Sequence, residues 1–487
     1  MPGGARPDSR RGGALPRSLE FSSLDPRSFL RALYRAAVSA VEPGKLVSEA
    51  LSRRGSAVVV RSVEDPGRRE FVFVPRRVVL LAVGKAAPAM AAAALRAIGD
   101  LVDETVVVAP AGVPPEELPP GGRFLPSSHP VPDERSLAAG REALALASGL
   151  GRDDLLVVLL SGGGSSLLAL PPEEVPLADK VRTVSLLAAA GAPAPDVNLV
   201  RGALSRLKGG RLAAAARQAD VVTLVLSDLG DAGWHLVASG PTFGVPPSRR
   251  TAAALLETWR IQPLVPSSVR SFLASPSANE EVRDGGQRWG VLLGDVRTAL
   301  EGARREALRF GADVRVLPEL LSGEARTAAR RLAVAGASAG NLVRRAGAPP
   351  RRLVTLFGGE TTVTVKGRGQ GGRCRELALA AAFHVDGIAG ANLLVAGTDG
   401  VDHTPDAAGA FVDHATLARA AALGLDPVAA LAGNDSGPFF AALGDAFAPG
   451  PTGTAVGDVA FVLAPGGEAL PAALDADEEG IPLPDRI

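Results

Sequence analysis

The stretch VVLLAVGKAAPAMAAAALRAI, residues 78–98, decides the fold class of this chain. Its first six residues are apolar without alternation, which is typical of a strand buried on both faces. A glycine, a lysine and an alanine-rich helical pattern follow. Residues 155–160 and 221–226 have the same apolar character, and each run also ends in a polar loop. Apolar strands that alternate with helices predict a parallel sheet covered by helices on both faces.

The later half of the chain predicts a second α/β unit with a mixed sheet. Residues 291–293 and 301–310 have the pattern of a strand followed by a helix. Residues 361–366 alternate threonine and valine, which is typical of a half-exposed strand. Further strands are expected at residues 352–357, 392–396 and 459–463, and further helices at residues 29–40 and 376–383.

A proline-rich stretch, residues 243–288, separates the two units and is expected to be irregular. The sequence therefore predicts an α/β fold of two domains. The N-terminal domain, residues 25–275, is expected to be a Rossmann-like α/β/α layer with a parallel sheet, and the C-terminal domain, residues 276–470, a mixed α/β layer. Loose polar tails are expected at residues 1–24 and 471–487.

Composition excludes several classes of protein. The 487 residues are too many for one core, and no apolar run reaches the ~20 residues of a membrane helix. The net charge of zero gives no sign of a nucleic-acid or membrane surface. The single cysteine, Cys374, excludes an internal disulfide and a cysteine-built zinc site. We therefore expect a cytoplasmic protein that acts on small molecules, with a homodimer left open.

Two glycine motifs follow the first two apolar strands. Lys85 ends the first strand and opens a helix, where it can meet a phosphate or carboxylate; the alternative is a lysine whose stem lies along apolar surface. A loop of three glycines and three serines follows the second strand and predicts an anion cradle, although a tight turn is the alternative. Its members are Ser161, Gly162, Gly163, Gly164, Ser165 and Ser166. The loop is neither a Walker A motif nor a dinucleotide fingerprint.

A polar face and several acids add further candidates. Asn198, Arg201, Ser205 and Lys208 fall within an arc of ~80° if the segment is one helix; a solvated face is the alternative. Asp228 ends the third apolar strand, a common place for a metal ligand or hydroxyl partner. The acids that suit Mg²⁺ are Asp231, Asp399 and Asp402, with an Asx-turn as the alternative for the last two. His129 lies in a loop that prolines restrict, and its role is left open: it could contact a ligand or be structural.

The segment FGGETTVTVKGRGQGGRCRELALA, residues 357–380, predicts a second anion site. Its glycine loop lies between an expected strand and an expected helix, so backbone N–H groups and the helix dipole can approach an anion. Arg373 would offer a planar fork to a carboxylate or phosphate. Glu360 and Arg368 of the same segment are candidate substrate contacts.

Taken in order, these motifs resemble those of the glycerate 2-kinase family, whose C-terminal half is called the MOFRL domain. The matching pieces include VGKAAPAM, SSHPVPDERS, LSGGGSSLL, NLVRGALSRLKGGRLA, LSDLGDAGWHLVASGPT, AGTDGVDHTPDAAGA, NDSGPFF and GPTGTAVGD, within residues 83–458. The resemblance implies ATP- and Mg²⁺-dependent phosphorylation of D-glycerate at its 2-hydroxyl. It also implies a site in the cleft between two α/β domains, with the MOFRL region at about residues 350–465.

The resemblance carries roles to individual positions. Lys85, Asp228 and Arg373 match the family's functional lysine, strand-end acid and Gly-Gly-Arg arginine, so they are the expected catalytic residues. Lys85 and Arg373 would bind the glycerate carboxylate or the transferred phosphoryl group, and Asp228 would orient the hydroxyl or hold magnesium. We assign the serine–glycine loop and Lys208 to the nucleotide phosphates. Candidate substrate contacts are Asn198, Arg201, Ser205, Glu360 and Arg368.

The chain departs from the family pattern at a few positions. Cys374 and Arg375 stand where Asn-Gln is usual, His403 where Gly is usual, Ala455 where Asn is usual, and Asp231 is shifted by one position relative to the family's acid. Three alternatives therefore stay open. They are a kinase for another small hydroxy acid, a relative that binds ligands without turnover, and a hydroxypyruvate reductase, an older label on similar chains for which no dinucleotide fingerprint is present.

Overall fold

The structure is a computed structural model that describes residues 25–62, 69–113, 118–230, 233–244, 247–275, 286–334 and 353–464. The two tails that the sequence predicts, and the metal candidate Asp231, lie outside these described residues.

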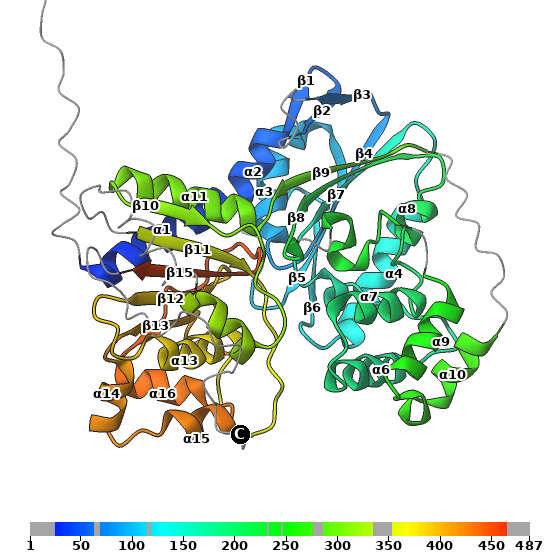
Figure 1. Cartoon of the computed structure of the whole chain (residues 1–487). Coiled ribbons are helices and arrows are strands. Elements are labelled where there is room, and N and C mark those ends of the chain that lie inside the picture. Colours follow the sequence, from blue (N-terminus) through cyan, green and yellow to red (C-terminus); the bar gives the residue numbers. More distant parts are fainter. Residues whose placement is uncertain are drawn as a thin grey trace, which may run out of the picture.

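Six parallel strands form the first sheet, as the apolar runs predicted, in the order β6-β5-β4-β7-β8-β9 (Figure 1). They are β4 (Arg77–Val83), β5 (Val102–Pro110), β6 (Arg123–Ser127), β7 (Asp154–Leu160), β8 (Asp220–Leu226) and β9 (Arg288–Gly294). Leu80 of β4 joins the core that contains Met90 of α3 (Ala87–Ile98), whereas Leu81 joins the core that contains Ala143 of α4 (Glu134–Ser148). Because side chains alternate along a strand, helices on both faces require apolar residues throughout.

The remaining elements of this half lie around that sheet. The helices are α2 (Pro43–Ala50), α5 (Gly164–Leu167), α6 (Leu177–Ala189), α7 (Ala194–Ala203), α8 (Arg211–Ala215), α9 (Arg249–Thr258) and α10 (Ser267–Ala274). Shorter 3₁₀ turns are η2 (Gly99–Leu101), η4 (Trp234–Ser239) and η5 (Gln262–Leu264). A small antiparallel sheet consists of β1 (Leu51–Arg54), β2 (Ala57–Arg61) and β3 (Glu70–Phe73).

The second sheet is mixed, as predicted, and has the order β10-β11-β15-β12-β13-β14. Its strands are β10 (Asp313–Val316), β11 (Leu353–Gly359), β12 (Asn392–Gly397), β13 (Gly409–Asp413), β14 (Ala446–Phe447) and β15 (Asp458–Ala464). Among the described strand pairs of this second sheet, only β10–β11 is parallel. The helices of this half are α11 (Val296–Arg309), α13 (Arg373–Val385), α14 (Thr416–Ala422), α15 (Pro427–Ala432) and α16 (Ser436–Leu443).

The N-terminal helix α1 (Pro26–Ala40) packs on the second sheet, whose strands lie far from α1 in the sequence (Figure 1). A Cβ on Gly302 of α11 would lie 2.5 Å from Ala40 Cβ, so the two helices approach closely only because residue 302 is glycine. The Tyr34 hydroxyl donates to Gly397 O at 2.8 Å, and Thr454 Oγ1 donates to Val41 O at 2.7 Å. Tyr34 of α1 and Val41, which follows the helix, therefore hold the end of β12 and the loop that precedes β15.

Several expected elements differ from the structure. Residues 361–366 are not a strand, because side chains satisfy the backbone instead: Thr364 N donates to Glu324, and Lys366 N and Gly367 N donate to Asn434 Oδ1. Residues 243–288 are not simply irregular, since they contain α9 and α10. The strand expected to open the second domain, β9, is the edge of the first sheet.

The helix expected at residues 198–208 is also shorter than predicted. It ends at Ala203, because Leu204 leaves the helical region with φ −90° and ψ 42°. Ser205 and Lys208 therefore lie in the loop beyond α7, and the single polar arc does not exist. No helix in the described ranges has the length and apolar character needed to cross a membrane.

Candidate active site

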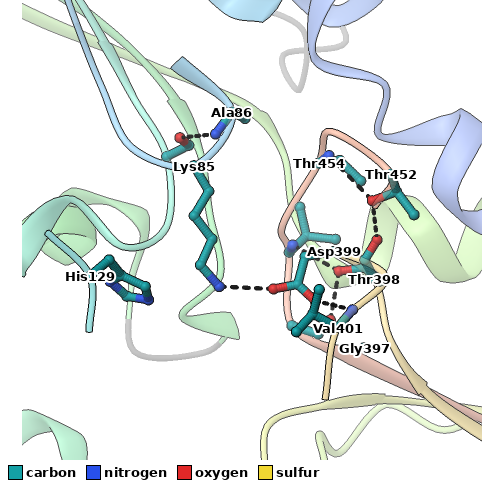
Figure 2. A network of polar contacts seen from close by, with 12 residues as sticks. Lys85, Ala86, His129, Gly397, Thr398, Asp399, Val401, Thr452 and Thr454 are labelled. Atoms are coloured by element: carbon teal, nitrogen blue, oxygen red, sulfur yellow. Dashed lines mark hydrogen bonds and ion pairs between the residues drawn. The ribbon is translucent and has the colours of Figure 1, made fainter. Parts of the chain in front are cut away.

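Lys85 connects the two sheets at their polar ends. Gly84, with φ +133°, brings the end of β4 so close to Ser161 that a Cβ would lie 2.1 Å from its Oγ. Ser161 Oγ accepts from Ala86 N at 3.1 Å, and Gly162 O accepts from Lys85 N at 2.9 Å. From this fixed base the Lys85 ammonium donates to Asp399 Oδ2 at 2.8 Å, as Figure 2 shows. The ion pair joins the loop after β4 to the loop after β12.

The glycines of the serine–glycine loop let three functional side chains converge. A Cβ on Gly162 would lie 2.3 Å from Asp228 Oδ2, and one on Gly163 would lie 3.2 Å from Lys85 Cγ and 3.3 Å from His129 Nδ1. Within the described residues, the N–H groups of Gly162 and Gly163 have no acceptor. The loop therefore provides open donors beside a lysine, and its role as an anion cradle stays a prediction.

His129 is a neutral partner in this group. Its Nδ1 lies 2.8 Å from Ser166 Oγ, and Figure 2 shows the ring beside the end of the Lys85 side chain. Burial, aided by the charge of Lys85, lowers the pKa of His129 to about 4. The imidazole is therefore uncharged near pH 7, and the sequence had left this residue open.

Asp228 keeps its carboxylate free. In the part of the chain that the structure describes, no other residue donates a hydrogen bond to it. Burial raises the pKa of Asp228, while the positive charges of Lys85 and Arg373 oppose that rise. A buried, unpartnered carboxylate between two cations suits a proton acceptor or a cation ligand.

Arg373 is the first residue of α13 and is held by two acids. Its Nε and Nη2 donate to Asp458 at 2.6 and 3.0 Å, and its Nη1 donates to Glu360 at 2.5 Å. Burial opposes the charge, but Asp458 and Glu360 raise the pKa of Arg373, so the guanidinium stays protonated. Burial raises the pKa of Glu360 to about 7 against the pull of Arg373. Asp458, which accepts the hydrogen bonds from Arg373 Nε and Nη2, was not among the candidate residues of the sequence analysis.

The metal candidates fare differently. Asp402 is buried and accepts from Cys374 N, Arg375 N and Arg375 Nε at 3.0, 2.9 and 3.1 Å, so both of its oxygens are engaged at the start of α13. Its assignment to magnesium stays a prediction that these contacts do not favour. Asp399 pairs with Lys85 and accepts from Val401 N at 3.1 Å. No group of three His, Cys, Asp or Glu side chains within the described ranges could hold a metal ion. Mg²⁺ at phosphoryl-transfer sites needs only one or two carboxylates besides the substrate phosphates, and Asp228 fits that requirement.

The positions that depart from the family pattern are mostly structural. Arg375 is buried and donates to Asp406 at 2.8 Å as well as to Asp402, while Cys374 is buried beside them. His403 has φ +64°, the backbone region in which glycine is free of strain. Ala455 is buried. These substitutions therefore alter the support of α13 more than the groups around Lys85.

The other substrate candidates divide into two groups. Asn198 accepts from Ser239 Oγ at 3.2 Å, and Ser239 contacts Ser165 of the glycine loop at 2.8 Å. Ser205 Oγ accepts from the N–H groups of Leu207 and Lys208, a structural role. Arg368 is exposed and makes no hydrogen bond or ion pair in the described structure. Asn198 is thus linked to the glycine loop through Ser239, whereas no hydrogen bond among the described residues links Ser205 or Arg368 to that loop.

Lys180 is a buried cation that the sequence prediction missed. It lies on α6 in a buried stripe with Thr183 and Leu187, spaced three and seven residues apart. Its spacing from Leu187 places it on the apolar side of an amphipathic helix, and that spacing could have indicated a buried lysine from the sequence alone. Lys208, which the sequence analysis assigned to the nucleotide phosphates, is fully buried and donates to Gly164 O of the glycine loop at 3.4 Å.

Two family descriptions match the chain. Residues 29–274 match a domain of unknown function, DUF4147, and residues 353–458 match the MOFRL family. The first match contains Lys85 and Asp228, and the second contains Arg373.

The chain is similar to curated proteins over most of its length. A D-glycerate 2-kinase of Thermotoga maritima is 36% identical over 425 residues, which cover 84% of this chain and 98% of that protein. A glycerate 2-kinase of Pyrococcus horikoshii is 32% identical, covering 91% and 98%. A protein of Agrobacterium vitis that carries the name of a hydroxypyruvate reductase is 36% identical, covering 91% and 96%. The crystal structure of the Thermotoga maritima glycerate kinase superposes with a TM-score of 0.72 at 34% identity, covering 90% and 99%.

Proposed function

The chain belongs to the glycerate kinase family with a MOFRL domain, and we propose that it transfers the γ-phosphoryl group of ATP to the 2-hydroxyl of D-glycerate. The products are ADP, 2-phosphoglycerate and a proton. The observation that supports this assignment best is the convergence of Lys85, Asp228 and Arg373 at the junction of the two sheets, where each follows or precedes a glycine-rich turn.

The roles follow from charge and protonation. Phosphoryl transfer depends mainly on positioning and on neutralising charge at the transferred group. Lys85 supplies an ammonium and Arg373 a guanidinium that stays protonated, so together they suit the phosphoryl oxygens and the glycerate carboxylate. Their present partners, Asp399, Asp458 and Glu360, hold both cations in place.

Asp228 is the group that we assign to the acceptor hydroxyl or to magnesium. Its raised pKa makes it a stronger base than an exposed carboxylate, which favours taking the hydroxyl proton. Magnesium, if bound here with ATP, would neutralise charge on the nucleotide phosphates. Because His129 is neutral, it does not repel the ammonium of Lys85, and it does not neutralise the positive charge that attracts an anion.

The test is an ADP-release assay with D-glycerate, L-glycerate and other small hydroxy acids, with and without Mg²⁺. Turnover with D-glycerate and formation of 2-phosphoglycerate are expected. Absence of a phosphorylated product across the panel would refute the kinase assignment. Because one relative carries the name of a hydroxypyruvate reductase, NADH oxidation with hydroxypyruvate is measured in parallel and is expected to be absent. A cytoplasmic location, which the single cysteine favours, is part of the same proposal.

A further inference from the structure

Four cations lie within electrostatic reach of one another near the serine–glycine loop: Lys180 of α6, Arg201 of α7, Lys208, and Arg211 at the start of α8. We call them the buried cation cluster. Lys180 is 5% exposed and Lys208 is 0% exposed. The Lys180 ammonium has no hydrogen-bond partner within the described residues. Lys208 Nζ reaches only Gly164 O, at 3.4 Å.

Lys180, Arg201 and Lys208 form no ion pair with an acid among the described residues. Arg201 makes no hydrogen bond or ion pair in the described part of the chain. Arg211 donates to the carbonyl oxygens of Gly202 and Lys208 at 2.9 and 3.2 Å. The acids nearest in sequence are engaged elsewhere: Asp179 accepts from Ser268 at 2.5 Å, and Asp196 accepts from Trp259 at 2.8 Å.

Such an arrangement is unfavourable in a protein that binds nothing there. Like charges repel one another, and a buried ammonium without a partner loses its hydration without compensation. The depressed pKa values of Lys180 and Lys208, both caused first by burial and then by neighbouring cations, are consistent with this strain. An anionic ligand would supply the missing counter-charge.

Position and charge indicate the class of anion. Lys208 contacts Gly164, a member of the serine–glycine loop, and Arg201 is near enough to His129 to affect its titration. The cluster therefore lies beside the serine–glycine loop and within electrostatic reach of His129. One carboxylate carries a single negative charge, whereas a diphosphate or triphosphate carries several, spread along a chain. We propose that the buried cation cluster binds the non-transferred phosphates of the nucleotide, with Lys180 as a direct phosphate ligand.

This inference rests on the proposed kinase function and adds a residue and a subsite to it. Lys85 and Arg373 are then left for the transferred phosphoryl group and the glycerate. Removal of Lys180 should affect nucleotide affinity but not glycerate affinity.

The experiment uses the full chain and the variant Lys180→Met, with Lys45→Met as the matched control. Lys45 is an exposed lysine of α2, 4.0 Å from Glu49. Calorimetric titration with ADP should give about 10- to 100-fold weaker binding for Lys180→Met, since hydrogen bonds to charged groups have that magnitude. D-glycerate affinity should be unchanged, and Lys45→Met should bind both ligands as the native protein does. Unchanged ADP affinity, or loss of glycerate affinity alone, would overturn the proposal.

Thermal unfolding supplies an independent test. A lysine that only supports the fold lowers Tm when removed, whereas removal of an uncompensated buried charge should raise the Tm of the ligand-free protein. Inorganic tripolyphosphate should raise the Tm of the native protein and compete with ADP, and failure to compete would count against a phosphate subsite. If Lys180→Met did not fold, this competition in the native protein would still decide. Turnover of D-glycerate by the native protein tests the kinase function separately, so either statement can fail alone.

Discussion

Lys85 is the side chain through which the first sheet reaches the second. Its backbone is fixed by Gly162 O, and its ammonium is held by Asp399, so the position of the charge depends on both halves of the molecule. A guanidinium at this place would be larger and differently hydrated. The compact ammonium explains why lysine stands here in a chain with only five lysines.

Replacing Lys85 by Met should lower kcat/KM for D-glycerate by about 100- to 1,000-fold, because removal of one positioned donor at a phosphoryl-transfer site has effects of that order. Tm should change little, since a partly exposed ion pair contributes about 0–1 kcal/mol. Steady-state kinetics and a melting curve measure both quantities. Lys45→Met is the control, and native activity in the Lys85→Met variant would contradict the assignment.

The titration of Lys180 makes stability depend on pH. Burial, with the charges of Arg201 and Arg211, lowers the pKa of Lys180 to about 7 from 10.5. Between these values the unfolded chain holds a proton that the native state has released, so the free energy of unfolding rises with pH. The penalty is fully present below pH 7 and is lost toward pH 10.5, a change of roughly 3–5 kcal/mol.

Urea unfolding of the ligand-free protein at a series of pH values checks this expectation. Lys208 lies in the same cluster and also titrates, so the comparison is with Lys180→Met, in which the Lys208 contribution remains. The difference between the two profiles should rise from pH 7 upward. A flat difference would mean that the pKa of Lys180 is the same in the folded and unfolded chain, so that burial does not make the native state release the proton.

The loop between β7 and α5 shows how an element sets the geometry of the site. Three glycines let the chain turn while Asp228, Lys85 and His129 occupy the space that side chains would fill. The lack of side chains at these glycines therefore matters for the site as much as their open N–H groups do.

Gly162→Ala should displace Asp228, because the new Cβ would lie 2.3 Å from the carboxylate oxygen. Misplacing a reacting group by about 1 Å costs up to about 100-fold in rate, so kcat/KM should fall by about 10- to 100-fold. Gly151→Ala is the control, since its Cβ would meet Asp154 at an ordinary 3.6 Å. Equal kinetics for the two variants would argue that Asp228 has room to move or no role in turnover.

Sequence patterns predicted the buried strands better than the exposed segments. Strands β4, β7 and β8 begin within one residue of their expected bounds, because a strand buried on both faces must be apolar throughout. The alternating stretch 361–366 failed because Glu324 and Asn434, distant in sequence, take its N–H groups. The positions of Lys85, Asp228 and Arg373 could be predicted from strand ends and glycine turns. The lack of a hydrogen-bond partner for Lys180 among the described residues could not be predicted, since it depends on how α6 packs against α7.

At the scale of the whole molecule, the described chain starts with α1 in the half that contains the second sheet, then forms the half that contains the first sheet, and then completes the second sheet. Helix α1 packs against α11 and the second sheet, whereas the strands that follow it form the small antiparallel sheet β1–β3 and then, from β4 to β9, the first sheet. The two halves are therefore joined by packing at α1 as well as by the Lys85–Asp399 ion pair.

Deleting residues 1–41 should prevent the second half from folding. The deletion removes six buried apolar residues, Phe29, Leu30, Leu33, Tyr34, Ala37 and Val41, whose burial contributes roughly 10 kcal/mol, comparable with the stability of a whole domain. Circular dichroism and soluble yield measure the loss. A deletion of residues 1–24 only is the control and should keep the native Tm. A cooperative transition at that Tm in the longer deletion would contradict this view of α1.

The pairing of α1 with α11 also has a consequence for biosynthesis. About 256 residues separate the end of α1 at Ala40 from the start of α11 at Val296. At roughly 5–20 residues per second, the ribosome needs on the order of ten seconds to a minute to supply that partner. The apolar face of α1 must wait uncovered for that time, so the nascent chain is a natural client for chaperones that shield hydrophobic segments.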